Sequence, residues 1–403
     1  MRRRIVVLLV LVIGCLCGPG CAISRGPAVP STLTEKAVLP GMEGCRIWAD
    51  DIKQPAFERM WDESIARERA LVGAGAPLPP ADFLVISGGG PDGAYGAGII
   101  CAWTEAGNRP QFKVVTGVST GALTAPFAFL GPDYDHVLKE VYTSLHTSGI
   151  MESRWLLAAL FGDALDDTVP LQRMLAKLVD QAMLERIAAE YKKGRLLLIG
   201  TTDLDVGRPV IWDIGAIASS GAPKALETVR KIMIASAAIP AAFPPVMFDV
   251  EVDGKKYQEL HVDGGAIRQA FLYPPHFHLK TESVKLHAGR TRTAWIIRNA
   301  RLDPDWASTQ RQTLRIAARA ISALLASEGK GDLDRMYLTT RRDGVGFNLA
   351  FIPPDFDVKP KEDFDPDYMR PLFERGRSDL LAGKVWKDVP PEFDEADFKS
   401  TIR

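Results

Sequence analysis

Two glycine-rich segments of the sequence carry residue types that suit acyl transfer. Residues 117–121 read Gly-Val-Ser-Thr-Gly, the Gly-x-Ser-x-Gly spacing of a nucleophile elbow, in which a serine hydroxyl projects from a tight turn between a strand and a helix. The amides at that helix N-terminus favour the negative charge that develops when Ser119 attacks an ester. Residues 88–93 read Gly-Gly-Gly-Pro-Asp-Gly and offer backbone N–H groups with no side chains in front of them, as an oxyanion hole requires.

A serine nucleophile needs a base, and the sequence offers two kinds. Asp263, followed by two glycines, is expected at the end of a strand where another backbone can approach closely. An aspartate with an ordinary pKa of about 3.9 is a poor base for a hydroxyl, so burial would have to raise its proton affinity. The alternative is a triad with a later histidine, but His276, His278 and His287 lie in a Pro- and charge-containing stretch typical of a solvated surface.

We therefore expect Asp263 to be the base. Replacing Ser119 by Ala or Asp263 by Asn should then abolish esterase activity, whereas single His→Ala variants should retain most of it. His261 lies two residues before Asp263 and so on the same side of the expected strand. It either tunes the carboxylate or only packs beside it.

The first glycine segment also fits a different chemistry, dinucleotide binding. Gly88-x-Gly90-x-x-Gly93 after a strand is the dinucleotide fingerprint, which requires an acid about 20 residues further on to hold a ribose hydroxyl. The second strand instead ends in residues 116–119, Thr-Gly-Val-Ser. We therefore expect no nucleotide cofactor. The sequence contains no His/Cys/Asp cluster with zinc-ligand spacing and no calcium loop, so we expect no metal either.

Strand–turn–helix units are expected to position these segments. Hydrophobic patterning predicts strands over 83–87, 112–116 and 293–300 and helices over 55–72, 94–103, 122–130, 308–325 and 368–381. Two consecutive strand–glycine–helix units predict a mainly parallel sheet with helices on both faces, with ligands at the C-terminal ends of the strands. Both glycine segments fall at such ends, and the part after residue 276 is expected to complete the same α/β domain.

Together these motifs resemble the patatin-like phospholipase family, bacterial acyl-lipid hydrolases that use a Ser–Asp dyad. The family's oxyanion, nucleophile and base motifs match residues 88–93, 117–121 and 263–265, and residues 201–207 and 235–245 are similar as well. The resemblance implies Ser119 as nucleophile, Asp263 as proton acceptor, Gly88, Gly89 and Gly90 as oxyanion hole, and Gly93, Gly117, Gly121, Gly264 and Gly265 as motif glycines.

One position departs from the family pattern. Family members often carry Arg or Lys before the last glycine of the first motif, where this chain has Asp92. Oxyanion stabilisation is therefore expected to rest on backbone amides alone.

The chain begins with features of an export signal. Three arginines precede an apolar run over residues 5–13, which is too short to span a bilayer, so residues 1–20 are predicted to be a signal peptide. The segment resembles a bacterial lipoprotein signal, with Cys21 as the lipidated residue. Cys15 fits the local lipobox pattern better but leaves a very short apolar core, and secretion without a lipid is a further alternative.

Composition and charge limit the class of protein and the kinds of partner that are expected. The 403 residues are 46% hydrophobic and 25% charged, which is typical of a globular protein. The net charge is −1, and losing the three arginines of the leader would make it −4, so a nucleic-acid partner is not expected. Cys45 and Cys101 could pair in an oxidising compartment, but the apolar surroundings of Cys101 favour a buried free thiol.

The sequence thus predicts one three-layer α/β/α domain with a patatin-like core over 81–275, completed by 276–403 and preceded by a tether and an amphipathic helix over 21–80. The predicted function is a phospholipase A-type acyl hydrolase that forms an acyl-Ser119 intermediate on membrane lipids. It is expected at the periplasmic or outer-membrane face, anchored by lipid at Cys21. The alternative is a catalytically silent lipid-binding envelope protein of the same fold. Oligomeric state is not predicted.

Overall fold

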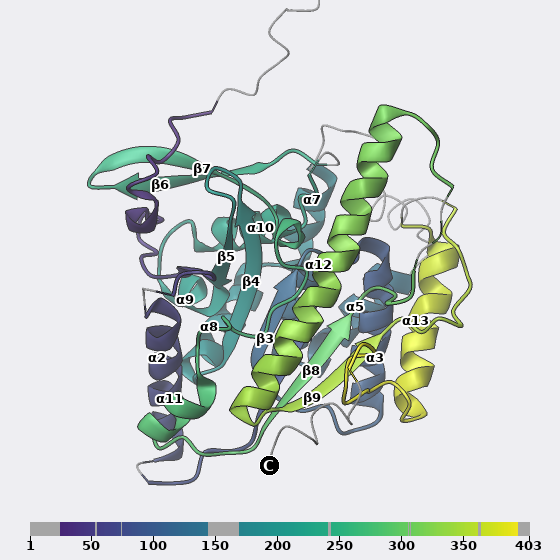
Figure 1. The fold of residues 1–403 in the computed structure, drawn as a ribbon. Coiled ribbons are helices and arrows are strands. Elements are labelled where there is room, and N and C mark those ends of the chain that lie inside the picture. Colours follow the sequence, from purple (N-terminus) through teal and green to yellow (C-terminus); the bar gives the residue numbers. More distant parts are fainter. Residues whose placement is uncertain are drawn as a thin grey trace, which may run out of the picture.

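A mixed nine-stranded sheet between two layers of helices forms the body of the protein (Figure 1). The computed structural model describes residues 25–393 apart from 53–54, 74, 144–168, 241–242, 305, 307 and 362–363. The predicted signal peptide and Cys21 therefore lie outside the described residues.

The element bounds are as follows. The strands are β1 (Arg46–Trp48), β2 (Ala81–Ile86), β3 (Phe112–Val118), β4 (Leu196–Asp203), β5 (Arg208–Asp213), β6 (Val246–Val252), β7 (Lys255–Asp263), β8 (Arg292–Arg298) and β9 (Gly346–Phe351). The α-helices are α2 (Ala56–Val72), α3 (Gly93–Glu105), α4 (Thr120–Leu130), α5 (Asp135–Thr143), α7 (Val169–Leu178), α8 (Gln181–Lys192), α9 (Ile214–Ser219), α10 (Ala225–Ser236), α11 (Leu279–Lys285), α12 (Thr313–Asp343) and α13 (Pro366–Leu381). The 3₁₀ turns are η1 (Thr34–Lys36), η2 (Gly90–Asp92), η3 (Pro132–Tyr134) and η4 (Gly264–Ala266).

The strand order brings both glycine segments to one edge of the sheet. The path runs β1-β5-β4-β3-β2-β8-β9, and the hairpin of β6 and β7 joins it by pairing β7 with β4. The central strands β4, β3, β2, β8 and β9 run parallel to one another, whereas β5 is antiparallel to β4. Strands β2 and β3 are direct partners, so the segments that follow them meet at the same C-terminal edge.

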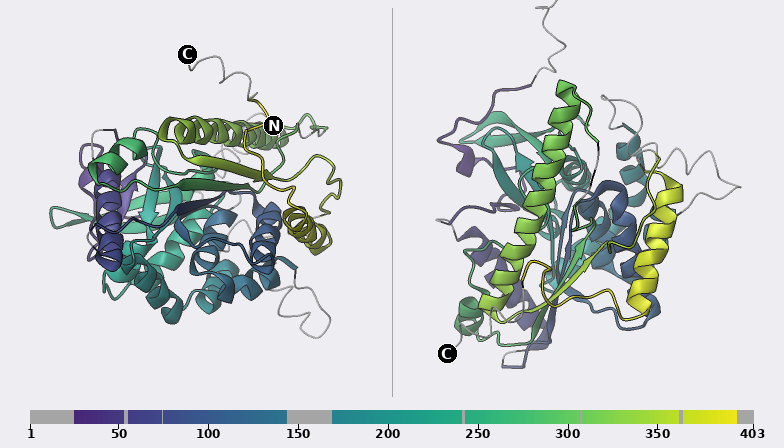
Figure 2. Two further views of the ribbon diagram at one scale, coloured as in Figure 1. Left: turned by 90° about the horizontal axis from the view of Figure 1, so that it is seen from below. Right: turned by 45° about the vertical axis from the view of Figure 1, so that its right-hand side comes forward.

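The sheet separates two hydrophobic cores. Along β2, Leu84 and Ile86 point into a core shared with α3, α4, α10 and α13, while Phe83 and Val85 point into a second core shared with α2, α11 and α12. This alternation follows from the two-residue repeat of a strand. The sheet is seen between its two helical layers in Figure 2. The predicted three-layer α/β/α architecture with a mainly parallel sheet is confirmed.

The C-terminal third completes the same sheet. Strand β8 pairs with β2, and β9 pairs with β8 at the sheet margin. Helix α12 is longer than the predicted 308–325 segment, because Leu333, Met336 and Tyr337 continue its contact with the second core. It ends at Gly344, whose φ of 67° is the left-handed conformation common after a helix.

The segment over residues 25–45, which was predicted to lie within a tether, packs against the domain together with β1. Strand β1 pairs with β5, Val38 bridges to Glu251, and the Arg25 guanidinium binds Asp205 with N–O distances of 2.7 Å. Composition suggested a tether, but apolar residues within the Pro-rich stretch, such as Leu39, are buried. The pairing partners of this N-terminal segment are distant in sequence, so local composition does not indicate them.

Two further features concern surfaces and thiols. Cys45 and Cys101 are free and buried, and burial raises the pKa of each thiol to about 12, so neither is a reactive thiolate near neutral pH.

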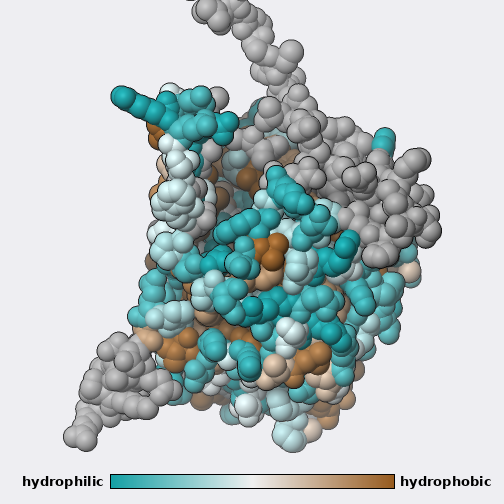
Figure 3. All heavy atoms as spheres, turned by 90° about the vertical axis from the view of Figure 1, so that its right-hand side faces the viewer, coloured by the Kyte–Doolittle hydropathy of each residue, from teal (hydrophilic) through white to brown (hydrophobic). Residues whose placement is uncertain are grey.

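Helix α13 turns Met369 and Phe373 inward. The face of the molecule on the α13 side is mostly hydrophilic, with small separate hydrophobic patches (Figure 3). Among the described residues, none of the helices is both long and apolar enough to cross a bilayer.

Candidate active site

Ser119 occupies a strained turn between β3 and α4. Its backbone has φ 56° and ψ −127°, a conformation that costs a residue with a β-carbon about 1–3 kcal/mol and persists only where the surrounding structure imposes it. Its amide donates to the Ser236 hydroxyl at 3.0 Å, and that hydroxyl donates to the carbonyl oxygen of Gly200 at 2.6 Å. Ser236 therefore fixes the elbow to β4. Sequence reasoning gave Ser236 no role, although it lies in a stretch that resembles the family.

The motif glycines permit close approach of backbones at the elbow. A β-carbon at Gly121 would lie 2.2 Å from the carbonyl oxygen of Ile86, and one at Gly117 would lie 2.4 Å from the carbonyl oxygen of Gly121. Only glycine therefore lets the start of α4 pack on the end of β2. A β-carbon at Gly93 would meet the Thr120 hydroxyl at 2.7 Å, so this glycine brings α3 against the elbow as well.

This packing yields a stability prediction. Gly121→Ala should lower the free energy of unfolding by about 3 kcal/mol or more, because the new methyl group overlaps the backbone of β2 and cannot move aside. Gly289→Ala is the matched control, since a β-carbon there meets no atom within 4 Å and should change stability by less than about 0.5 kcal/mol. Urea unfolding of both variants measures the difference, and equal stabilities would contradict the packing.

The Asp263 carboxylate stands beside this serine. It is 3% exposed at the end of β7, where one of its oxygens accepts the amide of Gly265 at 2.7 Å. Burial raises the pKa of Asp263 to about 7, while the hydrogen bonds from the Ser119 hydroxyl and the Gly265 amide oppose that rise. Gly264 makes this geometry possible, because a β-carbon there would lie 2.5 Å from the carbonyl oxygen of Gly200.

The glycine-rich loop after β2 leaves two of its three expected amides as candidate donors. Gly88 lies against Ser119, with its hypothetical β-carbon 3.0 Å from the serine β-carbon, but its amide already donates to the carbonyl oxygen of Gln269 at 3.1 Å. Gly88 is therefore not a free donor, and this expectation needs correction. Gly89 and Gly90 follow with φ angles of 155° and 56°, and their amides are the remaining candidates for an oxyanion hole.

Two residues outside the motifs hold this loop in place. Gln269 accepts the Gly88 amide with its backbone and donates its side-chain amide to the carbonyl oxygen of Gly265 at 2.9 Å, which joins the loop to the Asp263 turn. Asn299, directly after β8, donates to the carbonyl oxygen of Ser87 at 3.0 Å. Sequence reasoning missed both. The position of Asn299 at the end of a predicted strand was a usable signal, whereas Gln269 carried none.

Asp92, which departs from the family pattern, has a structural role. Its carboxylate accepts the Tyr368 hydroxyl at 2.5 Å and so connects the loop to α13. Burial raises the pKa of Asp92 to about 6, against the hydrogen bond from Tyr368 and the charges of Arg298 and Arg301. Burial also lowers the pKa of Arg298, whose Nε and Nη1 have no hydrogen-bond partner within the described part of the chain. Positive charge near this loop thus comes from β8 rather than from the loop.

His261 belongs to a separate buried network. Its ring nitrogens contact the Thr201 hydroxyl at 3.0 Å and the Glu259 carboxylate at 3.4 Å, which indicates a packing role rather than direct tuning of Asp263. Asp203, Glu259 and His261 bring one possible metal-ligand atom each within 4.8 Å of one another. The Arg46 guanidinium makes an ion pair with Glu259 and supplies this group with a cation of its own. We therefore assign no metal to it.

His278 and His287 lie away from Asp263, whereas His276 lines a cavity that Gly264 also lines. His278 and His287 are exposed and flank α11, which precedes β8 and so lies toward the opposite edge of the sheet (Figure 1). His276 is half-buried in the same connection. The side-chain partner of Asp263 is Ser119, so the geometry brings together a Ser–Asp pair.

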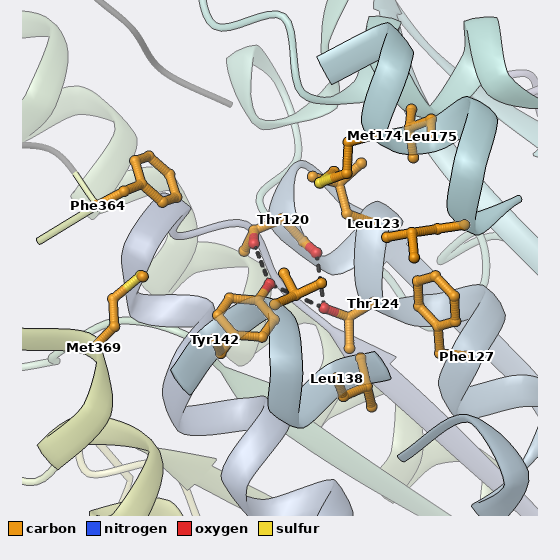
Figure 4. Close-up of a pocket in the computed structure, with 12 residues that line it drawn as sticks. Thr120, Leu123, Thr124, Phe127, Leu138, Tyr142, Met174, Leu175, Phe364 and Met369 are labelled. Carbon is orange, nitrogen blue, oxygen red and sulfur yellow. Dashed lines mark hydrogen bonds between the residues drawn. The ribbon is translucent and has the colours of Figure 1, made fainter. Parts of the chain in front are cut away.

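An apolar cavity opens beside the nucleophile elbow (Figure 4). Thr120 lines it at one end, where its hydroxyl contacts the Tyr142 hydroxyl at 2.7 Å. Other lining side chains are mainly apolar and include Leu123, Phe127, Leu138, Met174, Leu175, Phe364 and Met369. Its free volume of about 20 Å³ holds roughly one water molecule, so a larger ligand would have to displace these side chains.

Comparison with known proteins identifies the core of the chain. No curated protein matches the sequence. Among solved structures, VipD from Legionella pneumophila is similar with 13% identity and a TM-score of 0.34, over 76% of this chain and 68% of VipD. The type III effector ExoU is similar with 14% identity and a TM-score of 0.30, over 77% of this chain and 54% of ExoU.

The match to a protein family is more specific than these likenesses. Residues 84–273 match the family described as patatin-like phospholipase, and they include the glycine-rich loop, Ser119 and Asp263. The chain therefore contains, at residues 84–273, a domain that belongs to the patatin-like phospholipase family.

Proposed function

We propose that the protein is a lipid acyl hydrolase that cleaves carboxylic esters with a Ser119–Asp263 dyad. One observation carries this proposal: the Ser119 hydroxyl, held in a strained elbow, contacts a buried carboxylate whose pKa is raised to about 7. A base with a pKa near the working pH is efficient, because it is ionised and still binds a proton strongly. Family membership supports a lipid ester as the substrate.

The dyad would work in two steps. Asp263 takes the proton of the Ser119 hydroxyl as Oγ attacks the ester carbonyl carbon, and the amides of Gly89 and Gly90 stabilise the resulting oxyanion. The intermediate collapses when the bond to the leaving alcohol breaks and Asp263 returns the proton to that alcohol. Water, deprotonated by Asp263, then attacks the acyl-Ser119 ester, and the fatty acid leaves as Ser119 regains its proton.

The surroundings of the dyad suit an acyl chain better than a polar substrate. The cavity next to Thr120 is lined almost entirely by apolar side chains, and Thr120 directly follows the nucleophile (Figure 4). We assign the acyl chain to this cavity, which widens when its flexible side chains move. Its methionines, Met174 and Met369, have the rotatable bonds that such a movement needs.

The cell envelope is the proposed location. The leader over residues 1–20 supports export, and Cys21 is the proposed site of a lipid anchor, with residue 15 or secretion without lipid as alternatives.

Hydrolysis of a phospholipid tests the proposal. Purified protein and its Ser119→Ala variant are incubated with phosphatidylglycerol vesicles, and fatty acid and lysophospholipid are measured by mass spectrometry. We expect both products with the unchanged protein and neither with the variant. A folded protein that binds the vesicles but releases no fatty acid from phospholipids or triacylglycerols would instead support the silent lipid-binding alternative.

A further inference from the structure

Helix α12 divides into a packed half and an exposed half. Its C-terminal half buries Leu333 and Met336 in the second core. In its N-terminal half, Ile316 and Ile321 are each 49% exposed and Leu324 is 69% exposed. Large aliphatic side chains at this exposure on successive turns of one helix indicate a surface that something covers.

A further exposed apolar residue precedes the helix. Trp306, shortly before α12, is 86% exposed. Tryptophan is enriched where proteins meet the boundary between lipid and water, because its ring is apolar and its N–H is polar. We call Trp306, Ile316, Ile321 and Leu324 the docking face.

The charged residues between Trp306 and Ser327 are all basic. Residues 306–327 contain Arg311, Arg315 and Arg319 and neither Asp nor Glu. Ile316, Ala320 and Leu324 recur at a spacing of four, so they share one stripe of the helix, and the arginines at 315 and 319 flank that stripe. An apolar stripe flanked by arginines is the pattern of a helix that lies on an anionic lipid surface.

The exposed half of α12 stands at the catalytic edge of the sheet. In Figures 1 and 2 it rises beyond the C-terminal ends of the parallel strands, on the same side as the β6–β7 hairpin. Its packed half also contacts the site, since the Asp332 carboxylate accepts the amide of Gln269 at 2.7 Å. Gln269 in turn holds the glycine-rich loop and the Asp263 turn. The packed half of α12 is therefore joined to the glycine-rich loop and the Asp263 turn by hydrogen bonds.

The N-terminus emerges at this edge too. Arg25, the first described residue, binds Asp205 in the turn after β4 and the carbonyl oxygen of Gln258 on β7. Cys21 is only four residues earlier in the sequence. The described part of the chain therefore begins beside the turn after β4 and the strand β7 that carries Asp263.

We propose that the docking face binds an anionic lipid surface and holds the catalytic edge of the domain toward it. The orientation toward substrate rests on the proposed acyl hydrolase function, whereas the binding itself does not. Burying the aliphatic side chains provides affinity, and the three arginines select anionic over neutral lipid. A second copy of this chain is the competing occupant, and its like-charged arginines would oppose that pairing.

The experiment measures vesicle binding without catalysis. The chain from residue 22 onward, which keeps every residue that the structure describes, carries Ser119→Ala and is floated with vesicles of phosphatidylcholine alone or with added phosphatidylglycerol. We expect binding to the phosphatidylglycerol vesicles only. Ile316→Ser with Leu324→Ser should lower the partition coefficient at least tenfold, and Trp306→Ser should lower it severalfold.

Matched controls separate the docking face from general hydrophobicity and from failure of the enzyme. Leu71→Ser with Val284→Ser removes two equally exposed aliphatic residues from α2 and α11 and should change binding less than twofold. Without Ser119→Ala, the docking variant should hydrolyse a soluble short-chain ester as fast as the parent chain. Equal vesicle binding by the docking variant and the parent would overturn the proposal, as would a dimer that only the docking substitutions dissociate. An enzyme inactive on every ester, yet still bound to vesicles through this face, would overturn the proposed function alone.

Discussion

Replacing Ser119 by Ala is expected to lower kcat/KM for ester hydrolysis by at least about 10³-fold while leaving the fold intact. The loss is large because Ser119 is the proposed nucleophile, and without its hydroxyl the acyl intermediate cannot form on this residue. The fold should persist, since the Ser119 backbone amide keeps its bond to Ser236 and only the hydroxyl is removed. Steady-state hydrolysis of a soluble ester measures the loss.

Two controls accompany this variant. Ser378→Ala changes an exposed serine on α13, and His278→Ala changes an exposed histidine near α11, and both should keep activity within about twofold. Circular dichroism should show the same secondary structure in all of them. If His278→Ala lost as much activity as Ser119→Ala, a Ser–His–Asp triad would replace the dyad.

Asp263→Asn is expected to lower kcat/KM nearly as much as Ser119→Ala does. It should also abolish the decrease of kcat/KM at low pH. The wild-type base is ionised only above its pKa of about 7, so kcat/KM should fall roughly tenfold for each pH unit below that value. An amide keeps the bond from Gly265 but takes up no proton, so the residual activity of the variant should lack this dependence. Initial rates from pH 5 to 9 test it, and a wild-type kcat/KM that stays constant down to pH 5 would contradict a buried base with a raised pKa.

The same substitution should stabilise the protein at alkaline pH. Asp263 binds its proton more tightly in the folded state, with a pKa of about 7, than in the unfolded chain, where 3.8 applies. Folding stability therefore falls as pH rises from about 4 to about 7 and is constant above that. Asp263→Asn should gain up to about 4 kcal/mol over wild type at pH 8 and little at pH 4. The buried Asp92 and Asp213 titrate in both proteins, so the comparison cancels their effects.

The sequence predicted the parts of the site that depend on local pattern. Both strand–glycine–helix units lie where hydrophobic runs and glycines placed them, because the turn after a parallel strand needs small residues wherever backbones meet. Gly121 is an example, since its neighbour across the turn leaves no room for a side chain. The burial of the Asp263 carboxylate was predictable from the local pattern too, because Asp263 lies between apolar strand residues and two glycines.

Long-range partners account for what the sequence did not predict. The Gly88 amide is taken by Gln269, which lies 181 positions further along the chain, so no local pattern could exclude it from the oxyanion hole. Ser236 reaches the elbow from the end of α10 for the same reason. Strand β1 also depends on a distant partner, because Arg46 needs Glu259 and its strand needs β5.

The most direct test of the dyad is the rate at which a fluorophosphonate modifies Ser119 as a function of pH. The reagent traps an activated serine, and peptide mass spectrometry locates the adduct. We predict one adduct, on the peptide that contains Ser119, formed at a rate that rises through pH 7 in the wild type and is at least about 10²-fold slower in Asp263→Asn. A folded protein that remains unlabelled at Ser119, or that is labelled equally fast without the Asp263 carboxylate, would contradict the dyad.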